Sequence, residues 1–356
     1  MTSSNQAVHK IAFPIRIGID PMERLLVASF KGDPEFEMIE PQIFDDPVNG
    51  KGMRILRYRT DQKVDVYWQP GVKTDRSTIS IGGGIGDFQE INIDPARFEI
   101  TDHGVDLHLA FTDAKKRKVE FKILENTTVN NRFPLLAPVG KDIDNPLRLF
   151  LVYMHEFDFV RKKGTEILAR IGDRELLPAS FPILRNYQKV MLMRYSAESV
   201  IGAFNPQSDM PVVFELSVPG SVEVDGMRVS VNEHYRVKKI DVGQGRCTAQ
   251  IDFLPGFPNL LDLSEGTTEE GRWTFRISNI VITGGTYNLM WRGDSVGVEI
   301  DVTENWKPSG LPLSFEIFTQ LVRSFRSWPT TYKWRGIVRL NDTLTMDGTW
   351  IRKGKR

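Results

Sequence analysis

Hydrophobic and polar residues alternate with a period of two along most of this chain of 356 residues. Successive side chains of a β-strand point to opposite faces of the sheet, so this alternation is typical of strands with one buried face. Turn-forming pairs such as Asp225-Gly226 and Asp347-Gly348 separate the alternating runs. Many short strands joined by frequent turns favour antiparallel sandwiches or barrels. The main alternating runs are 64–68, 98–100, 105–111, 119–124, 212–218, 227–231, 273–278 and 296–302.

Helical patterns are scarce in the sequence. Residues 314–328 place several phenylalanines on one helical face, and Pro329 would end such a helix. The same segment also fits a strand, and we favour the helix. Residues 196–204 could form one or two further helical turns before the Asn205-Pro206 pair. The sequence therefore predicts an all-β protein with few short helices.

Four glycines fall between positions 82 and 86 and raise the question of a phosphate-binding loop. A dinucleotide-binding loop leads through its glycines into a helix, whose N-terminus holds the pyrophosphate. Here residues 88–93 alternate like a strand, and Asp94-Pro95 follows. A Walker loop also requires Gly-Lys-Ser or Gly-Lys-Thr, whereas Gly86 precedes Asp87. The glycines instead predict a bulge or corner where a strand bends or passes close to another backbone.

The length of the chain favours two domains. The polar segment 205–211 is the best break, and an earlier break near 178–182 is the alternative. We predict two antiparallel β-barrel-like domains, residues 1–205 and 206–356. Six of the seven tryptophans lie from Trp273 onward, which indicates denser aromatic packing in the second half, as core or as the wall of a cavity.

A hairpin over residues 53–68 carries the first candidate site. If Asp61-Gln62 forms its turn, Tyr58 pairs with Asp65, and both faces mix polar with apolar residues. A barrel accepts such faces when its lumen holds water or a ligand. The alternative is an edge hairpin with arginine stems lying along the surface. The candidates are Asp65 as an acid and Tyr58, Tyr67 and Trp68 as ligand contacts.

A second candidate site lies in the apolar run 149–160. As a strand, this run places Tyr153 and His155 on one side and Glu156 and Asp158 on the other. His155 is the best acid/base candidate because an apolar wall shifts the pKa of an imidazole. Glu156 and Asp158 could share a proton if they face a cavity. The ordinary alternatives are a core histidine and a solvated carboxylate face.

Charge and cysteine content exclude several classes of protein. Lysine plus arginine and aspartate plus glutamate both number 46, so no global field attracts nucleic acid or anionic lipid. The basic run 352–356 fits a solvated tail. One cysteine, Cys247, cannot form an intramolecular disulfide, and its alternating surroundings predict a buried thiol in a reducing compartment. Without a signal peptide or an apolar span, the sequence predicts a soluble, cytoplasmic protein.

Metal and hydrolase motifs are absent from the sequence. The five histidines form no HExxH or HxH pair, there is no cysteine cluster, and no Gly-x-Ser-x-Gly elbow occurs. We therefore predict no metal and no cofactor.

The two β-rich halves resemble tandem lipocalin-type barrels. The features that carry the resemblance are the hairpin 53–68, the meander 105–124 and the closing pair 334–340 and 344–350. They are similar to the two-domain calycin-like family that includes carotenoid hydratases. The resemblance covers most of the chain as architecture and matches no signature motif. It implies an apolar ligand in one or both barrels.

These observations predict a protein that binds a hydrophobic small molecule, lipid-like or terpenoid-like, in a barrel cavity, with Trp291 as a further ligand contact. The first alternative is a cofactor-independent hydratase or isomerase that uses Asp65, His155 or Asp158 as its acid. The second is an interaction module that exposes aromatic residues of the segment 328–334. The oligomeric state is not predicted.

Overall fold

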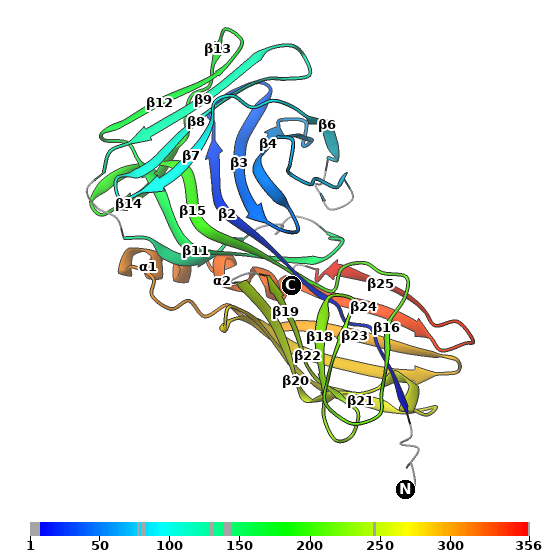
Figure 1. Cartoon of the computed structure of the whole chain (residues 1–356). Helices are drawn as coiled ribbons and strands as arrows, with labels where there is room; N and C mark the ends of the chain where they lie inside the picture. Colours follow the sequence, from blue (N-terminus) through cyan, green and yellow to red (C-terminus); the bar gives the residue numbers. More distant parts are fainter. Residues whose placement is uncertain are drawn as a thin grey trace, which may run out of the picture. The chain divides into compact units, whose positions relative to one another are not determined.

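Figure 1 shows the computed structural model of the chain, which describes residues 8–76, 79, 83–127, 131–138, 144–244 and 247–354. Strands make up 62% of the protein, and its helices α1 (Leu313–Leu321) and α2 (Ser324–Ser327) are short. The predicted all-β architecture is confirmed. In the described residues the sheets form open paths and no closed barrel.

The chain divides into two compact units. One contains Pro21–Leu135 and Met154–Val200, and we call it the two-sheet unit. The other contains Met1–Asp20, Leu136–Tyr153 and Ile201–Arg356, and we call it the meander unit. Unlike the contiguous halves expected from the sequence, each unit is assembled from separate stretches of the chain.

The strands of the two-sheet unit belong to two sheets, and β2, β10, β11 and β15 cross the division between the units. The first sheet has the order β10 (Phe133–Leu136), β11 (Leu149–Arg161), β15 (Gln188–Phe204), β2 (Ile17–Ser29), β3 (Phe36–Asp46), β4 (Gly50–Arg59), β5 (Val64–Trp68) and β6 (Ile85–Glu90), with β14 (Ser180–Arg185) beside β15. The second has the order β13 (Arg174–Glu175), β12 (Thr165–Ile171), β9 (Lys118–Glu125), β8 (Gly104–Thr112) and β7 (Ala96–Thr101).

A single hydrophobic core joins the two sheets of this unit. Its buried residues come from both sheets, for example Leu26 and Ile55 from the first and Leu107 and Phe121 from the second. Side chains from two facing sheets form such a core when each strand turns one set of alternate residues inward. The unit is therefore a sandwich-like arrangement of two open sheets.

The hairpin of β4 and β5 differs by one residue from the predicted register. Arg57 pairs with Asp65, and Tyr58 pairs with Val64. The loop holds three residues rather than two, because Gln62 adopts a φ of 67° and the amide of Arg59 bonds the carbonyl of Lys63 at 2.9 Å. A shift of one residue changes which side chains share a face. It places Arg57 and Asp65 side by side, so the predicted Tyr58–Asp65 pairing is wrong.

The glycine-rich segment leads into strand β6, as the alternating pattern predicts, and not into a helix. Strand β6 pairs with β5 in parallel. A Cβ atom on Gly83 would lie 2.3 Å from the carbonyl oxygen of Gln62, so only glycine permits this close approach of two backbones. Gly82 lies outside the described residues. The glycines therefore serve the packing of the chain at this corner.

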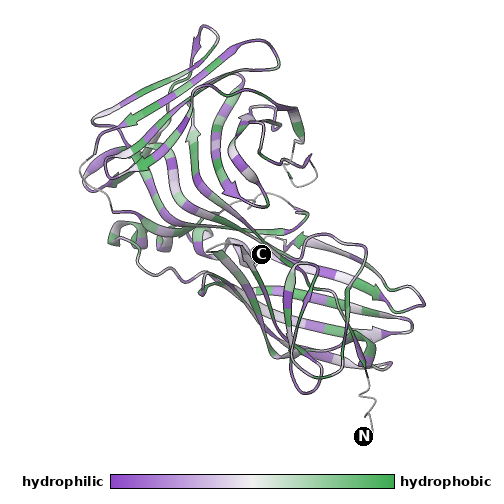
Figure 2. Ribbon diagram, viewed as in Figure 1, coloured by the Kyte–Doolittle hydropathy of each residue, from purple (hydrophilic) through white to green (hydrophobic). Residues whose placement is uncertain are grey.

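Nine strands of the meander unit follow one another both in sequence and in space, each antiparallel to the next. A separate pair joins β1 (His9–Phe13) to β16 (Val212–Leu216). Figure 2 shows the alternation of apolar and polar residues along these strands. The meander comprises β17 (Ser221–Val224), β18 (Met227–Val231), β19 (Val237–Gln244), β20 (Cys247–Phe257), β21 (Thr268–Ile277), β22 (Ile280–Arg292), β23 (Ser295–Glu304), β24 (Tyr332–Arg339) and β25 (Thr345–Arg352).

Aromatic residues fill the core of the meander unit. Phe204 packs against Trp273, Phe275 and Trp350, with ring centroids 4.8 to 5.8 Å apart. The indole nitrogen of Trp350 donates to the carbonyl oxygen of Phe204 at 3.1 Å, which satisfies its buried N–H. The aromatic richness of the second half therefore belongs to its core.

The helix predicted over 314–328 is confirmed as α1 and α2, followed by a 3₁₀ turn at Trp328–Thr331. The helical turns expected at 196–204 are wrong, because these residues complete β15, where sheet pairing overrides local propensity. The segment 328–334 does not expose its tryptophans, since Trp328 and Trp334 are both buried. Cys247 is half-buried rather than buried.

Candidate functional site

A buried arginine on β4 organises the first cluster of charged residues in the two-sheet unit. One terminal nitrogen of Arg57 donates to Asp65 Oδ2 at 3.0 Å and to the hydroxyl of Tyr67 at 2.9 Å. The other terminal nitrogen lies 3.3 Å from Asp113 Oδ2. The guanidinium also lies over the ring of Phe36, 4.3 Å from its centroid. Two predicted site residues, Asp65 and Tyr67, thus meet at one cation.

The hydroxyl of Tyr67 links this cluster to β6. It donates to Asp87 Oδ2 at 2.7 Å, and the backbone amide of Asp87 donates to Asp65 Oδ1 at 3.0 Å. Burial raises the pKa of Tyr67, Arg57 acts against this increase, and the bond to Asp87 adds to it. Tyr67 therefore stays a neutral hydrogen-bond donor, and its surroundings are not those of a base.

The cluster extends toward the surface through Arg117. Burial alone would raise the pKa of Asp113, but the amide and the guanidinium of Arg117, together with Arg57, hold it below its usual value. Arg117 also donates to Glu35 at 2.6 Å, and this bond is the main reason that the pKa of Glu35 is strongly lowered. These carboxylates are ionised and paired, as a structural ion network requires.

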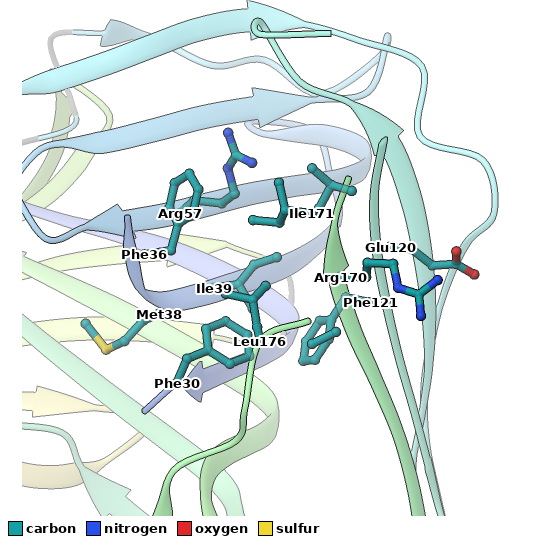
Figure 3. Close-up of a pocket in the computed structure, with 12 residues that line it drawn as sticks. Phe30, Phe36, Met38, Ile39, Arg57, Glu120, Phe121, Arg170, Ile171 and Leu176 are labelled. Carbon is teal, nitrogen blue, oxygen red and sulfur yellow. The ribbon is translucent and has the colours of Figure 1, made fainter. Parts of the chain in front are cut away.

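The cavity beside this cluster is small, with a volume of about 10 Å³. A site of this size holds about one water molecule. Figure 3 shows its lining, in which Phe36 lies next to Arg57, while Glu120 and Arg170 turn their charged ends away from the other labelled side chains. This cavity does not have room for a lipid or a terpenoid.

A second buried cluster surrounds Asp158, another predicted acid. Asp158 is fully buried and accepts hydrogen bonds from Arg161 at 2.8 Å and from Arg185 at 3.0 Å. The amides of Arg161 and Val105 donate to the buried carboxylate of Glu125. Burial raises the pKa of Glu125, and these two donors reduce the increase. The alternative of a solvated carboxylate face is wrong for Asp158, because β11 is buried on both faces at this point, whereas Glu156 is exposed.

The other candidates of β11 are separated from Asp158. His155 is half-buried, and burial lowers its pKa, whereas Glu198 and Glu156 act in the opposite direction. Glu156 is exposed and binds Arg132 at 3.0 Å. Tyr153 belongs to the meander unit and is buried, which raises its pKa to about 12.

The remaining candidates occupy three further places. Tyr58 donates to Glu40 at 2.8 Å on the face of β4 opposite to Arg57, and burial raises the pKa of Glu40. Trp68 stacks obliquely on Phe88. Trp291 of the meander unit is half-buried and donates to the carbonyl oxygen of Gly293 at 2.7 Å. The structure therefore does not collect the predicted ligand contacts around one cavity.

A larger hollow lies on the outer face of the meander sheet, across β22 to β25. This groove has a volume of about 500 Å³. Its centre is a cross-strand row in which Gly297 pairs with Met290 on one side and with Ile337 on the other. Met290 and Ile337 are 38% and 47% exposed. The groove is lined by Asn288, Met290, Arg292, Ser295, Gly297, Val298, Glu299, Arg335, Gly336, Ile337, Asp347, Gly348 and Thr349.

Sequence reasoning missed this groove, although two signals were present. In the alternating run 296–302, the outward positions should be polar, and Gly297 holds one of them without a side chain. Met290 and Ile337 hold outward positions on the neighbouring strands. Only the pairing of three strands shows that these positions adjoin one another.

Comparisons with protein families, curated proteins and solved structures give no match for this chain. Within the described ranges, no group of three or more histidine, cysteine, aspartate or glutamate side chains is arranged to hold a metal ion. None of the helices in the part of the chain that the structure describes is long and apolar enough to cross a membrane.

Proposed function

We propose that this protein binds a hydrophobic small molecule and that the groove on the meander unit is its binding site. The observation that carries the proposal is the volume of about 500 Å³ above an apolar row formed by Met290, Gly297 and Ile337. Ligand sites usually combine such an apolar floor with a few polar groups and have volumes of about 300–1,000 Å³. A ligand here would cover two large apolar side chains that are otherwise in contact with water.

The proposal retains the ligand class expected from the sequence and changes its location. A barrel-like, lipocalin-type enclosure would hold the ligand inside a lumen. The sheets described here are open, and the cavity beside Arg57 has a volume of only about 10 Å³. These two observations favour binding on a sheet face over binding inside the two-sheet unit.

The acid/base alternative receives less support. Asp65 and Asp158 each accept hydrogen bonds from a buried arginine, and the two carboxylates lie in separate clusters. A carboxylate whose oxygens already accept hydrogen bonds from guanidinium groups is less available to contact a substrate. We therefore favour binding over catalysis.

Titration with a neutral, environment-sensitive naphthylamine dye tests the proposal. Gly297→Val should place a branched side chain in the middle of the groove floor without strain, because a Cβ atom there would lie 3.7 Å from its nearest neighbour. Gly243→Val is the matched control, since Gly243 lies in β19 of the same sheet and has similar room, with 3.8 Å to the nearest atom. Valine also suits a strand better than glycine does.

We expect the wild type and Gly243→Val to bind the dye equally. Gly297→Val should bind it at least about tenfold more weakly, because the added side chain keeps the dye from covering Met290 and Ile337. The loss of this apolar contact costs more than about 1.4 kcal/mol of binding free energy. Circular dichroism should show the three proteins equally folded. Absence of dye binding to the wild type, or equal binding to Gly297→Val, would contradict the proposal.

A further inference from the structure

The cations around the groove are paired unequally. At one end, Arg335 and Lys333 share the carboxylate of Glu299, at 2.6 Å and 3.5 Å. At the other end, Arg292 and Arg339 are both exposed, and in the described part of the chain neither has a carboxylate within 4.0 Å. Arg292 lines the groove, and Arg339 lies on the same face of β24 two residues beyond Ile337, so two cations without a carboxylate partner adjoin this end of the groove.

The sheet register brings these two arginines toward a common point. Ser295 of β23 pairs with Arg292 on β22 and with Arg339 on β24, so the arginines flank it on either side. Adjacent strands lie about 4.8 Å apart, which separates the two backbones by about 10 Å. Two long arginine side chains can reach one anion across that distance, and guanidinium groups bind carboxylate and phosphate oxygens in a bidentate manner.

The unpaired cations adjoin the apolar floor. The Nε atom of Arg292 lies 3.1 Å from the sulfur of Met290, one row further along the sheet. From Ser295 through Gly297 to Glu299 the strand covers five residues, and its four steps span about 13 Å. A ligand extended along β23 would therefore meet charge at one end and apolar surface beyond it.

Building on the proposed function, we infer that the ligand is an anionic amphiphile. Its head group, a carboxylate, phosphate or sulfate, binds between Arg292 and Arg339. Its apolar part lies over Gly297, between Met290 and Ile337. The groove holds the single molecule rather than a membrane surface.

Two carboxylates line the groove, and Asp347, unlike the paired Glu299, opposes such a ligand. Asp347 of β25 pairs with Ile337 and lines the groove, and no cation among the described residues lies within 4.0 Å of it. Asp347 lies in the row of Met290, Gly297 and Ile337, one row from the proposed head-group position, and its negative charge opposes an anionic head at that separation. Replacing Asp347 with asparagine should therefore strengthen the binding of an anion, whereas it should not affect a neutral ligand.

Isothermal titration with decanoate, decanol and inorganic phosphate tests the inference, each below its aggregation concentration. We expect decanoate to bind at least about tenfold more tightly than decanol, as a charge-assisted hydrogen bond would provide. The double variant Arg292→Gln/Arg339→Gln should lose this preference and still bind decanol. Asp347→Asn should bind decanoate more tightly. Arg272→Gln removes an exposed arginine outside the groove that is already paired with Glu304, and it should behave like the wild type.

Equal binding of decanol and decanoate, unchanged in the double variant, would overturn the inference and leave the proposed function standing. Phosphate binding as tightly as decanoate would also overturn it, since the site would then recognise a simple anion. Binding to anionic phospholipid vesicles without binding to monomeric decanoate would overturn it in favour of a membrane surface. Failure of both decanol and the dye to bind would instead overturn the proposed function.

Discussion

The two units of this protein bury different kinds of residue. In the described chain, every buried side chain with a formal charge lies in the two-sheet unit, where Arg57, Asp113, Asp158 and Arg161 are examples. The meander unit buries tryptophan, phenylalanine and aliphatic residues, and its ion pairs are half-buried, as between Arg236 and Glu269, or more exposed, as between Arg272 and Glu304. Both units are built from strands of similar length, so strand formation alone does not decide what a core contains.

The cores of the two units should respond differently to substitution. A buried ion pair gains little net stability, because desolvation offsets the attraction between the charges, but loss of one partner leaves the other charge buried and unpaired. An apolar core loses stability in proportion to the buried volume removed. The two units should therefore differ most in their response to removal of a charge.

Asp158→Ala should cause the largest loss of stability, about 3–5 kcal/mol, because it leaves Arg161 and Arg185 buried without their shared carboxylate. Urea unfolding followed by circular dichroism measures the loss. A loss below about 1 kcal/mol would contradict the structural role of the cluster.

The Trp68→Phe variant is a useful background in which to follow the meander unit by fluorescence. The other six tryptophans lie in the meander unit, so their fluorescence then reports on that unit alone.

Ile300→Ala should destabilise the meander unit by about 2–5 kcal/mol, since Ile300 is fully buried on the inner face of β23. In the Trp68→Phe background the fluorescence transition should move to lower urea. Ile300→Val, which removes a single methyl group, should cost only about 0.5–1.5 kcal/mol. Equal effects of the two substitutions would show that this position is not tightly packed.

His155 should make the two-sheet unit less stable in acid. Burial lowers its pKa below 6.5, so the unfolded chain takes up this proton at a higher pH than the folded protein does. The stability contributed by neutral His155 is complete above a pH of about 6.5 and is lost as the pH falls through the folded pKa. The urea midpoint of the wild type should therefore fall more on acidification than that of His155→Leu.

Glu125 provides a control of opposite sign for the effect of pH. Because its pKa is raised in the folded protein, protonated Glu125 contributes stability. This stability is complete below a pH of about 4.5, the ordinary pKa of a glutamate, and is lost as the pH rises through the folded pKa. Glu125→Gln should remove this dependence and leave the one due to His155. An identical pH dependence in wild type and His155→Leu would show that His155 titrates normally.

Exposed ion pairs should contribute least to the free energy of unfolding, and their contribution should be equal in the two units. Lys122→Gln in the two-sheet unit and Arg272→Gln in the meander unit each remove one member of an exposed pair. Solvent screening limits such pairs to about 1 kcal/mol or less. A clear difference between these two variants would mean that the units differ in more than their buried charges.

Prediction from sequence succeeded where pairing is local and one face is apolar. The alternation in 273–278 and 296–302 corresponds to β21 and β23 of the meander, whose strands pair with their neighbours in sequence. It failed at the hairpin of β4 and β5, where a loop of three residues in place of two changed the face on which Asp65 lies. It also failed at 196–204, where β15 lies between strands that are distant in sequence.

The candidate sites were harder to predict than the strands. Asp65 and Tyr67 were selected from the sequence, but Arg57 links them to Asp113, which lies 56 residues from Arg57 in the chain. Tyr67 also bonds Asp87, 20 residues away. Five strands separate Asp65 from Asp158 in chain order, and the two carboxylates lie in separate clusters. The groove required three strands to place Met290, Gly297 and Ile337 in one row.

The sequence by itself determined that this is an all-β protein with few helices, because the period-two pattern is a local property that each strand carries. It also indicated denser aromatic packing in the second half, because the tryptophans are concentrated there, and left open whether they form core or the wall of a cavity. Only the tertiary structure decided which charges are buried and which are exposed. That outcome depends on strand pairing between distant segments, and a shift of one residue in register exchanges the two faces of a strand.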